Sequence, residues 1–470
     1  MNRKLQITLH IIADLISASA SWFLFFLYRK HVVEAVKHGY EIPVNNDLKL
    51  FVGLIAIPVM WLLVYAGSGY YKNIFRRSRL REVERTFISG IVGSLVIFFL
   101  LILDDSVANY KDYYKSLLVY FSLHTGITLL LRLVVVSRTI FMIQHRKWGY
   151  KTLLVGSGIT AGKLYTELSE AKKSEGFNIQ GYISGKANVT AEMGKLTCLG
   201  TKENISEVIR SHNIEDVIIC LDDDEHDWVP GLVDQIQNEN VHLKILPDSY
   251  GMVLGIVKMN NILGAMLVEV DFEVMPQWQK TAKRFFDIVI SLLALMFGLP
   301  IFILIGIAIK LDSAGPVFFR QQRIGFKGKV FEIFKFRSMR NDAEKSGPQL
   351  SSEKDDRRTR VGAFLRKSRL DELPQFINVL KGDMSIVGPR PERQYFIDQI
   401  VKKAPYYVRL HRIKPGITSW GQVKFGYAEN VDEMVERMKY DILYLENMSL
   451  GLDIKIMIYT ALIMIQGRGK

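Results

Sequence analysis

Cysteine is nearly absent from this chain. Cys198 and Cys220 are the only two cysteines among 470 residues, so there is neither a disulfide framework nor a metal-ligand cluster. A disulfide-stapled secreted fold is therefore excluded, and a reducing, cytosolic setting is favoured for the folded regions.

Acidic residues are also few relative to basic ones. There are 48 Asp and Glu against 61 Lys and Arg, which gives a formal net charge of +13. Such a charge fits an anionic partner: anionic lipid, a phosphate-bearing substrate or nucleic acid. The cationic residues lie next to apolar segments and no nucleic-acid recognition motif stands out, so we expect no nucleic acid partner.

Apolar residues, in contrast, are abundant and clustered. Hydrophobic residues make up 49% of the chain while 23% of residues are charged, which indicates apolar segments joined to soluble domains. Four apolar stretches in the first third each approach the length of about 20 residues that spans a bilayer. They are residues 5–28, 48–69, 86–104 and 113–136. The alternative is four buried helices of a large soluble protein.

The connections between these stretches differ in charge. The second is basic, whereas the third holds Asp104, Asp105 and Asp112 against Lys111. By the positive-inside rule the second connection is cytoplasmic. We therefore expect a multi-pass membrane region with everything after Arg138 on the cytoplasmic side. The basic residues of the second connection are Lys72, Arg76, Arg77, Arg79, Arg81 and Arg85.

From about residue 148 to 270 the pattern becomes strand, glycine turn, helix. Residues 151–155 are predicted to form a strand and 161–168 a helix, with Gly156, Ser157 and Gly158 in the turn between them. This is how a Rossmann-like unit begins. A helix at 205–211 and strands at 217–221 and 241–245 complete the expected α/β domain.

The evidence for a dinucleotide in this domain is weak. Gly156, Gly158 and Gly162 are spaced more widely than the dinucleotide fingerprint, and a lone glycine match carries little weight. No acidic residue ends the presumed second strand, where Tyr182 to Gly185 stand. We expect a structural or regulatory role, with NAD binding as the alternative.

A fifth apolar segment spans about residues 285–310, with Asp287 near its start and Pro300 near its middle. Basic residues flank both ends, so both ends look cytoplasmic. Because proline removes a helical hydrogen bond, Pro300 could bend the helix back toward the face it entered. We expect a re-entrant helix rather than a spanning one. The flanking residues are Lys280, Lys283, Arg284, Lys310, Arg320, Arg323, Lys327 and Lys329.

The stretch from Gly315 to Met339 is dense in glycine, basic and aromatic residues. Glycine lets backbone approach a ligand, and arginine offers a planar fork to phosphate oxygens. A solvated basic face that binds lipid headgroups is the equal alternative.

Asp371 and Glu372 stand just before Pro374, which is at home in the first turn of a helix. Ser368 and Asp371 have a capping-box-like spacing, so Asp371 could simply satisfy backbone donors. Adjacent carboxylates near cations also suit a magnesium site that handles pyrophosphate. Taken alone, these residues leave both alternatives open.

Residues 280–470 resemble the bacterial sugar transferase domain of polyprenyl-phosphate hexose-1-phosphate transferases, the monotopic phosphoglycosyl transferases. Ser338 stands where threonine is frequent and Ser419 where glycine is common, and neither departure touches the carboxylate pair. The four-span and Rossmann-like arrangement also resembles the large subgroup of this family. The matching elements are Lys283, Arg284, Asp287, the block from Pro316 to Met339, Asp371 to Gln375, Asn378, Lys381 to Ser385, Val387 to Glu392, Lys414 to Thr418, Tyr440, Asp441, Tyr444, Asn447, Ser449, Leu450 and Asp453.

The resemblance implies three regions: a membrane α-helical bundle (1–147), a Rossmann-like α/β domain (148–270) and a mixed α/β catalytic domain with a re-entrant membrane helix (278–470). It implies transfer of sugar 1-phosphate from a UDP-sugar to undecaprenyl phosphate, with UMP released, at the start of exopolysaccharide, capsule or O-antigen synthesis. The expected location is the bacterial inner membrane, with the soluble domains in the cytoplasm. Membrane lipid is a further expected partner, and a homo-oligomer is compatible with the resemblance.

The resemblance also implies roles for individual residues. Asp371 would attack the phosphate that bears the sugar, giving an aspartyl phosphosugar, and Glu372 would hold Mg²⁺ or orient Asp371. Arg390 would bind nucleotide or phosphate, and Pro389 and Pro391 would form either a nucleotide wall or a rigid loop. Further phosphate candidates are Lys335, Arg337 and Lys414; Arg320 and Arg323 would face lipid phosphate or substrate phosphate.

At the helix entry, Lys283, Arg284 and Asp287 are either a charged interfacial entry or a pair that pins the helix angle. Two rival functions remain. A membrane-anchored NAD-dependent dehydratase requires a tyrosine and a lysine four residues apart, and only Tyr182 and Lys186 have that spacing, too soon after the glycine turn. A non-catalytic scaffold for polysaccharide assembly would leave Asp371 and Glu372 without a purpose. The sugar itself is left open.

Overall fold

The computed structural model divides the chain into two compact units, residues 1–272 and 273–470. It describes residues 3–35, 40, 47–72, 74–102, 110–184, 193–222, 228–236, 239, 241–246, 267–270, 275–340, 343, 347, 355–426 and 428–466. Asp104, Asp105, Gly185 and Lys186, on which part of the sequence reasoning rests, lie outside the described residues.

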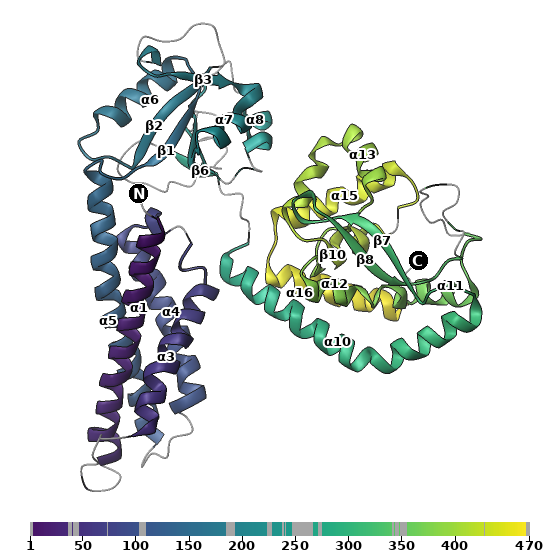
Figure 1. Cartoon of the computed structure of the whole chain (residues 1–470), viewed down its shortest axis with the longest axis horizontal. Coiled ribbons are helices and arrows are strands. Elements are labelled where there is room, and N and C mark those ends of the chain that lie inside the picture. Colours follow the sequence, from purple (N-terminus) through teal and green to yellow (C-terminus); the bar gives the residue numbers. More distant parts are fainter. Residues whose placement is uncertain are drawn as a thin grey trace. The chain divides into compact units, whose positions relative to one another are not determined.

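The first unit begins with four long helices (Figure 1). All four are long and apolar enough to cross a membrane, as the sequence predicts. Three of them extend beyond the predicted stretches at one or both ends because their polar ends continue the helix, whereas the second, Leu48–Gly67, ends two residues before its predicted stretch does. The helices are α1 (Arg3–Tyr28, continued by a π-helical turn Arg29–Glu34), α3 (Leu48–Gly67), α4 (Arg79–Ile97, continued by a π-helical turn Phe98–Ile102) and α5 (Tyr110–Gln144).

Close helix packing in this bundle depends on two glycines. A Cβ on Gly53 would lie 2.0 Å from Trp22, and one on Gly93 would lie 2.2 Å from Trp61. Both tryptophans are buried. Small residues let the backbones approach, which is how helices associate where no water drives them together.

An α/β domain follows α5. Its sheet has the order β3-β2-β1-β4-β5-β6, and all neighbouring strands are parallel except the last pair. The strands are β1 (Tyr150–Val155), β2 (Phe177–Ser184), β3 (Cys198–Thr201), β4 (Asp216–Ile219), β5 (His242–Ile245) and β6 (Val268–Val270). The helices are α6 (Ile159–Glu170), α7 (Ile205–Ser211) and α8 (Val229–Ile236).

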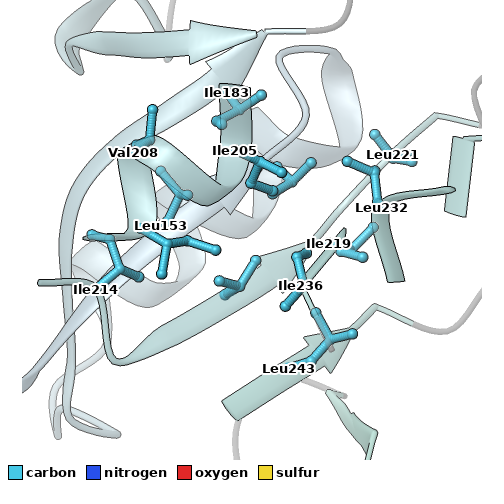
Figure 2. Close-up of a cluster of buried hydrophobic side chains, with 13 residues drawn as sticks. Leu153, Ile183, Ile205, Val208, Ile214, Ile219, Leu221, Leu232, Ile236 and Leu243 are labelled. Atoms are coloured by element: carbon cyan, nitrogen blue, oxygen red, sulfur yellow. The ribbon is translucent and has the colours of Figure 1, made fainter. Parts of the chain in front are cut away.

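One of the two buried apolar clusters of this domain lies between the sheet and the helices α7 and α8 (Figure 2). Leu153 of β1 and Ile219 of β4 are fully buried in one cluster with Ile205 of α7 and Ile236 of α8. Strands buried in this way read as nearly continuous apolar runs, which is why β1 and β4 could be predicted from the sequence.

An ion pair connects the α/β domain to the connection between α3 and α4. Two guanidinium nitrogens of Arg76 donate to the carboxylate of Asp216, at 3.0 and 2.5 Å, and Asp216 is fully buried at the start of β4. Arg76 also lies 4.2 Å from the ring centre of Tyr150, whose hydroxyl donates to the carbonyl of Phe75 at 2.8 Å. The first β-strand is therefore tied to the membrane-side loop.

The second unit packs short strands and helices on one long helix, α10 (Gln277–Asp312), which contains Pro300 and is bent (Figure 1). The predicted segment 285–310 lies within this helix, which begins eight residues earlier and ends two residues later. β7 (Phe318–Ile324) pairs with β8 (Val330–Phe336) antiparallel, and β9 (Ser385–Val387) pairs with β10 (Gly416–Thr418) parallel. The helices are α11 (Arg360–Lys367), α12 (Gln375–Lys381), α13 (Gln394–Lys403), α14 (Trp420–Lys424), α15 (Val431–Glu446) and α16 (Leu450–Ile465).

The first arm of α10 is fixed to this unit by charged side chains. Lys283 Nζ donates to Asp453 at 2.6 Å, and Arg284 donates to the carbonyl of Val379 at 2.6 Å. Asp287 is buried and accepts from the hydroxyl of Ser385 at 2.8 Å and from the backbone N–H of Ile386 at 3.1 Å. The helix entry is thus pinned to β9, α12 and α16, and among the described residues Asp287 forms no ion pair with Arg284, so the alternative of an Asp287–Arg284 pair is wrong.

The second arm is fixed to the same unit. Asp312 accepts from the backbone N–H of Val361 at 3.0 Å, and Arg337 donates to the carbonyl of Ser313 at 2.6 Å. Ile305 and Ile309 are buried against Phe336 and other apolar side chains. Both arms of one long apolar helix therefore rest on one α/β unit.

We predict that Arg76→Ala costs the α/β domain about 3–5 kcal/mol in free energy of unfolding, because it leaves the buried Asp216 without its counter-ion. Thermal melting in detergent and limited proteolysis of the domain measure this. Arg79→Ala is the matched control, since Arg79 is exposed. Replacing both partners, Arg76→Met with Asp216→Leu, should lower the free energy of unfolding less than either single change. If Arg76→Ala melts at the same temperature as wild type, the proposed role of the ion pair is wrong.

Candidate active site

Asp371 and Glu372 lie in a single 3-10 turn, Leu370–Glu372, immediately before α12. Arg369 precedes them in the left-handed region with φ of 55°, which turns the chain into the site. The carboxylates therefore lie just before a helix start, as Pro374 predicts. Ser368 does not take part in a capping box with Asp371; its hydroxyl donates backward to the carbonyl of Phe364 at 2.8 Å.

Glu372 is held by cations. Lys335 Nζ on β8 donates to Glu372 Oε1 at 2.7 Å, and Arg390 Nη1 lies 3.6 Å from the same oxygen. The Glu372 residue is only 4% exposed. Burial acts to raise the pKa of Glu372, but the charges of Lys335 and Arg390 outweigh burial and keep the pKa below its usual range.

Asp371 is different. It is 6% exposed, and among the described residues no hydrogen bond or ion pair holds its carboxylate. Burial raises the pKa of Asp371 to about 6, an effect that the positive charge of Lys335 reduces and the negative charge of Glu372 increases. The site therefore contains one carboxylate whose pKa the neighbouring cations lower and one whose pKa burial raises.

The position of Lys335 depends on Asn378 of α12. Asn378 is fully buried; its Oδ1 accepts from the backbone N–H of Phe334 at 3.0 Å, and its Nδ2 donates to the carbonyl of Glu332 at 2.6 Å. One amide side chain thus joins α12 to β8 and sets Lys335 opposite Glu372. The resemblance includes Asn378, but sequence reasoning gave it no role.

The loop that carries Arg390 is held from three sides. The carbonyl of Pro389 accepts from Gly416 N–H at 2.9 Å, and the carbonyl of Pro391 accepts from Arg323 Nη1 at 3.1 Å. Glu392 next in the chain accepts from Arg437 of α15 at 2.5 Å. The proline pair therefore belongs to a fixed loop, one of the two alternatives expected from the sequence.

Two residues of α15 support this loop. Sequence reasoning missed Arg437; the resemblance includes Asp441, but sequence reasoning gave it no role. Arg437 binds Glu392, and Asp441, one turn later, accepts the backbone N–H of Gly421 at 2.9 Å and also that of Arg390. Burial raises the pKa of Asp441 to about 6. Nothing in the local sequence signals these partners, because they lie 45 and 20 residues apart in the chain.

A small pocket adjoins the same loop. Pro389, Arg390 and Pro391, which the resemblance assigns to nucleotide or phosphate, lie together in its wall. Arg390 thus borders this pocket and also lies close to Glu372. Its lining is Ile324, Gly325, Pro389, Arg390, Pro391, Tyr407, Leu410, His411, Ile413 and Pro415.

The remaining phosphate candidates occupy different environments. Arg337 is buried and donates to the carbonyls of Ser313 and Ala314 at the end of α10. Arg323 is partly buried and contacts Pro391 and Glu392. Arg320 is exposed beside Glu332. Lys414 is partly buried, which lowers its pKa. The phosphate roles of these four residues stay predictions.

A magnesium ion is compatible with the carboxylate pair. Within the described part of the chain no three His, Cys, Asp or Glu side chains gather as a closed metal cage. Mg²⁺ is often bound by only one or two carboxylates plus water and substrate phosphate. The carboxylate of Asp371, which no cation of the described residues pairs within hydrogen-bond distance, suits that donor set.

The chain has relatives among known sugar transferases. A family model described as bacterial sugar transferase matches residues 278–467, and one described as CoA-binding domain matches residues 67–247. The UDP-glucose:undecaprenyl-phosphate glucose-1-phosphate transferase of Escherichia coli is 32% identical over 325 residues, 68% of each chain. An uncharacterized sugar transferase of Haemophilus influenzae is 28% identical over 464 residues, 93% of each chain.

The relative from Aeromonas hydrophila, a UDP-N-acetylgalactosamine-undecaprenyl-phosphate N-acetylgalactosaminephosphotransferase, is 44% identical over 187 residues. That match covers 40% of this chain and 44% of the relative's length. Fold, site and relatives together define a sugar transferase with candidate membrane helices. The chain belongs to the polyprenyl-phosphate hexose-1-phosphate transferase family, as the resemblance predicts.

Proposed function

We propose that this protein transfers a sugar 1-phosphate from a UDP-sugar to undecaprenyl phosphate, with UMP as the second product. The observation that carries the proposal is the unequal carboxylate pair: Glu372 is paired with Lys335 and Arg390, whereas Asp371 has no counter-ion within hydrogen-bond distance among the described residues. A carboxylate without such a partner beside fixed cations is suited to attack a phosphate whose charge the cations neutralise. The named reactions of the relatives agree with this chemistry.

In the first step an oxygen of Asp371 attacks the phosphorus that bears the sugar. A new O–P bond forms, the bond from this phosphorus to the bridging oxygen breaks, and UMP leaves with that oxygen and its electron pair. Lys335 and Arg390 lie where they would balance the charge on the phosphates. The product is an aspartyl phosphosugar.

In the second step an oxygen of undecaprenyl phosphate attacks the same phosphorus. The bond to Asp371 breaks, the carboxylate returns, and undecaprenyl diphosphate sugar leaves. Two bulky anions then never need to meet in one transition state, which is the advantage of a covalent intermediate.

Glu372 and Asp371 would hold Mg²⁺ when it binds, and the ion would supply charge neutralisation to the pyrophosphate. Glu372 is already fixed by Lys335, so it also orients the turn that carries Asp371. The rigid loop from Pro389 to Pro391 would form a wall for the nucleotide.

We propose that α10 is re-entrant and that both soluble regions face the cytoplasm. The support is that both arms of this helix are fixed to one unit by Lys283, Asp287, Asp312 and Arg337. Its middle is exposed and strongly apolar. On α16, Ile454, Ile458 and Leu462 are exposed at a four-residue spacing, as on a helix that lies along a membrane surface.

The strand order of the α/β domain supports a Rossmann-like fold. β2 and β3 follow on one side of β1, and β4, β5 and β6 follow on the other side. The dehydratase alternative has no support in this domain. Tyr182 is buried inside β2, and Lys186 lies outside the described residues.

We predict that Asp371→Asn lowers UMP release from a UDP-sugar by more than about 10³-fold, because the nucleophile is lost. The assay uses purified protein in nanodiscs with undecaprenyl phosphate, Mg²⁺ and a panel of UDP-sugars. Asp398→Asn, an exposed aspartate on α13, is the matched control and should retain full rate.

The same proteins separate an enzyme from a scaffold. With a donor labelled in the sugar and no acceptor, wild type should become covalently labelled, and Asp371→Asn should not. Folded wild-type protein that releases no UMP and takes up no label from any donor would refute the proposed function.

We predict that kcat/KM falls about tenfold per pH unit below pH 6 and is level above it, because only the ionised form of Asp371 attacks and its pKa is raised to about 6. Lys335→Met removes a positive charge that lowers this pKa, so the acid limb should move to higher pH. A pH profile of UMP release measures both. An acid limb at the usual pKa of a solvent-exposed aspartate, near 4, would show that burial does not control Asp371.

We predict that single cysteines at Lys280 and Lys310 are both protected from a membrane-impermeant maleimide in intact spheroplasts and both react after lysis. The background is Cys198→Ser with Cys220→Ser, checked by UMP release. Lys111→Cys, in the first turn of α5 next to the third connection, should react before lysis. Reaction of Lys310→Cys in intact spheroplasts would mean that α10 spans the membrane.

A further inference from the structure

The glycine turn of the α/β domain is the place where such a fold receives a phosphate. Gly156, Ser157 and Gly158 follow β1 and lead into α6. In α/β domains that bind nucleotides, the free N–H groups at this helix start donate to oxygens of the pyrophosphate. The match to a CoA-binding domain therefore implies a cofactor here.

In this chain a carboxylate of the protein holds that position. Asp222, three residues after the end of β4, accepts the backbone N–H of Thr160 at 3.0 Å and that of Ile159 at 3.3 Å. These are the first two residues of α6. Asp222 thus satisfies the donors that a ligand phosphate would need, and its negative charge faces the positive end of the helix.

The turn is also closed sterically. A Cβ on Gly158 would lie 1.7 Å from Asp222 Oδ2, and one on Gly156 would lie 2.2 Å from the carbonyl oxygen of Cys220. The two glycines therefore serve the close approach of the chain's own β4 end. In a cofactor site the same glycines give room to the ligand.

The described residues at the turn provide no positive charge that could stabilise a bound phosphate. The described segments that meet here, residues 156–160 and 220–222, contain no lysine or arginine. The Ser157 residue is fully buried, with its hydroxyl accepting from Ser184 at 3.3 Å. Ser184 ends β2, where a dinucleotide site would carry an acidic residue for the ribose.

We propose that Asp222 is a built-in anion that occupies the phosphate position of the α/β domain, so that the domain takes neither CoA nor a dinucleotide there. The domain then acts without a cofactor, as a permanently closed structural element that Arg76 ties to the loop between α3 and α4. UDP-sugar is left to the second unit alone.

The test is binding of CoA, NAD⁺ and inorganic phosphate to the full chain in detergent, by calorimetry, with UDP present to fill the proposed donor site. Wild type should show no saturable binding. Asp222→Ala removes the carboxylate and frees the two N–H groups, so it should bind inorganic phosphate at least about tenfold more tightly than wild type. Its melting temperature should fall in phosphate-free buffer and recover when phosphate is added.

Asp222→Asn is the matched variant, because it keeps an acceptor for the helix but loses the charge. It should melt close to wild type and gain less phosphate binding than Asp222→Ala. Saturable CoA or NAD⁺ binding by wild type that Gly158→Val abolishes would overturn the proposal. The proposal would also be overturned if Asp222→Ala, still folded and still releasing UMP, bound no more phosphate than wild type.

Discussion

A carboxylate that the fold removes from water must find a cation or several N–H donors, and this constraint organises both units. Asp14 of α1 is buried with Arg132 of α5 at 2.7 Å, and Asp453 of α16 with Lys283 of α10 at 2.6 Å. Their partners lie 118 and 170 residues away in the chain. Breaking one such pair costs far more than an exposed ion pair gives, because the remaining charge stays buried. The pairs therefore fix which segments lie together.

The candidate active site follows from an exception to the same constraint. The buried carboxylate of Glu372 is paired with Lys335. Asp371 is buried to a similar degree but has no such cation partner among the described residues. The cost of that burial appears as a raised pKa. A group that the fold leaves unsatisfied is the one that gains most from bond formation with a phosphate. This is the physical reason for proposing Asp371 as the nucleophile and Glu372 in the supporting role.

Short-range patterns in the sequence predicted the helices and strands. Contacts between residues that are far apart in the chain could not be predicted in this way. Apolar runs and glycine turns predicted β1 and α6 to within two residues, and they predicted the four long helices, although α4 begins seven residues earlier and α5 ends eight residues later than predicted. The start of α10 was placed too late because Lys283 and Arg284 look like the end of an apolar segment, although basic residues are good helix formers. The partners Lys335 with Glu372, Arg437 with Glu392 and Asp222 with α6 lie 37 to 63 residues apart, so only the tertiary fold brings them together.

Strand β8 and the residue directly after it connect the apolar helix α10 to the two carboxylates. Lys335 binds Glu372, and two residues later Arg337 binds the carbonyls at the end of α10. Two residues along an extended chain span about 7 Å. The distance from the end of α10 to the acidic pair is therefore set by a short, rigid backbone segment, which no loop movement can change. If α10 lies in the bilayer, this segment therefore holds the acidic pair at a fixed distance from the end of the membrane helix.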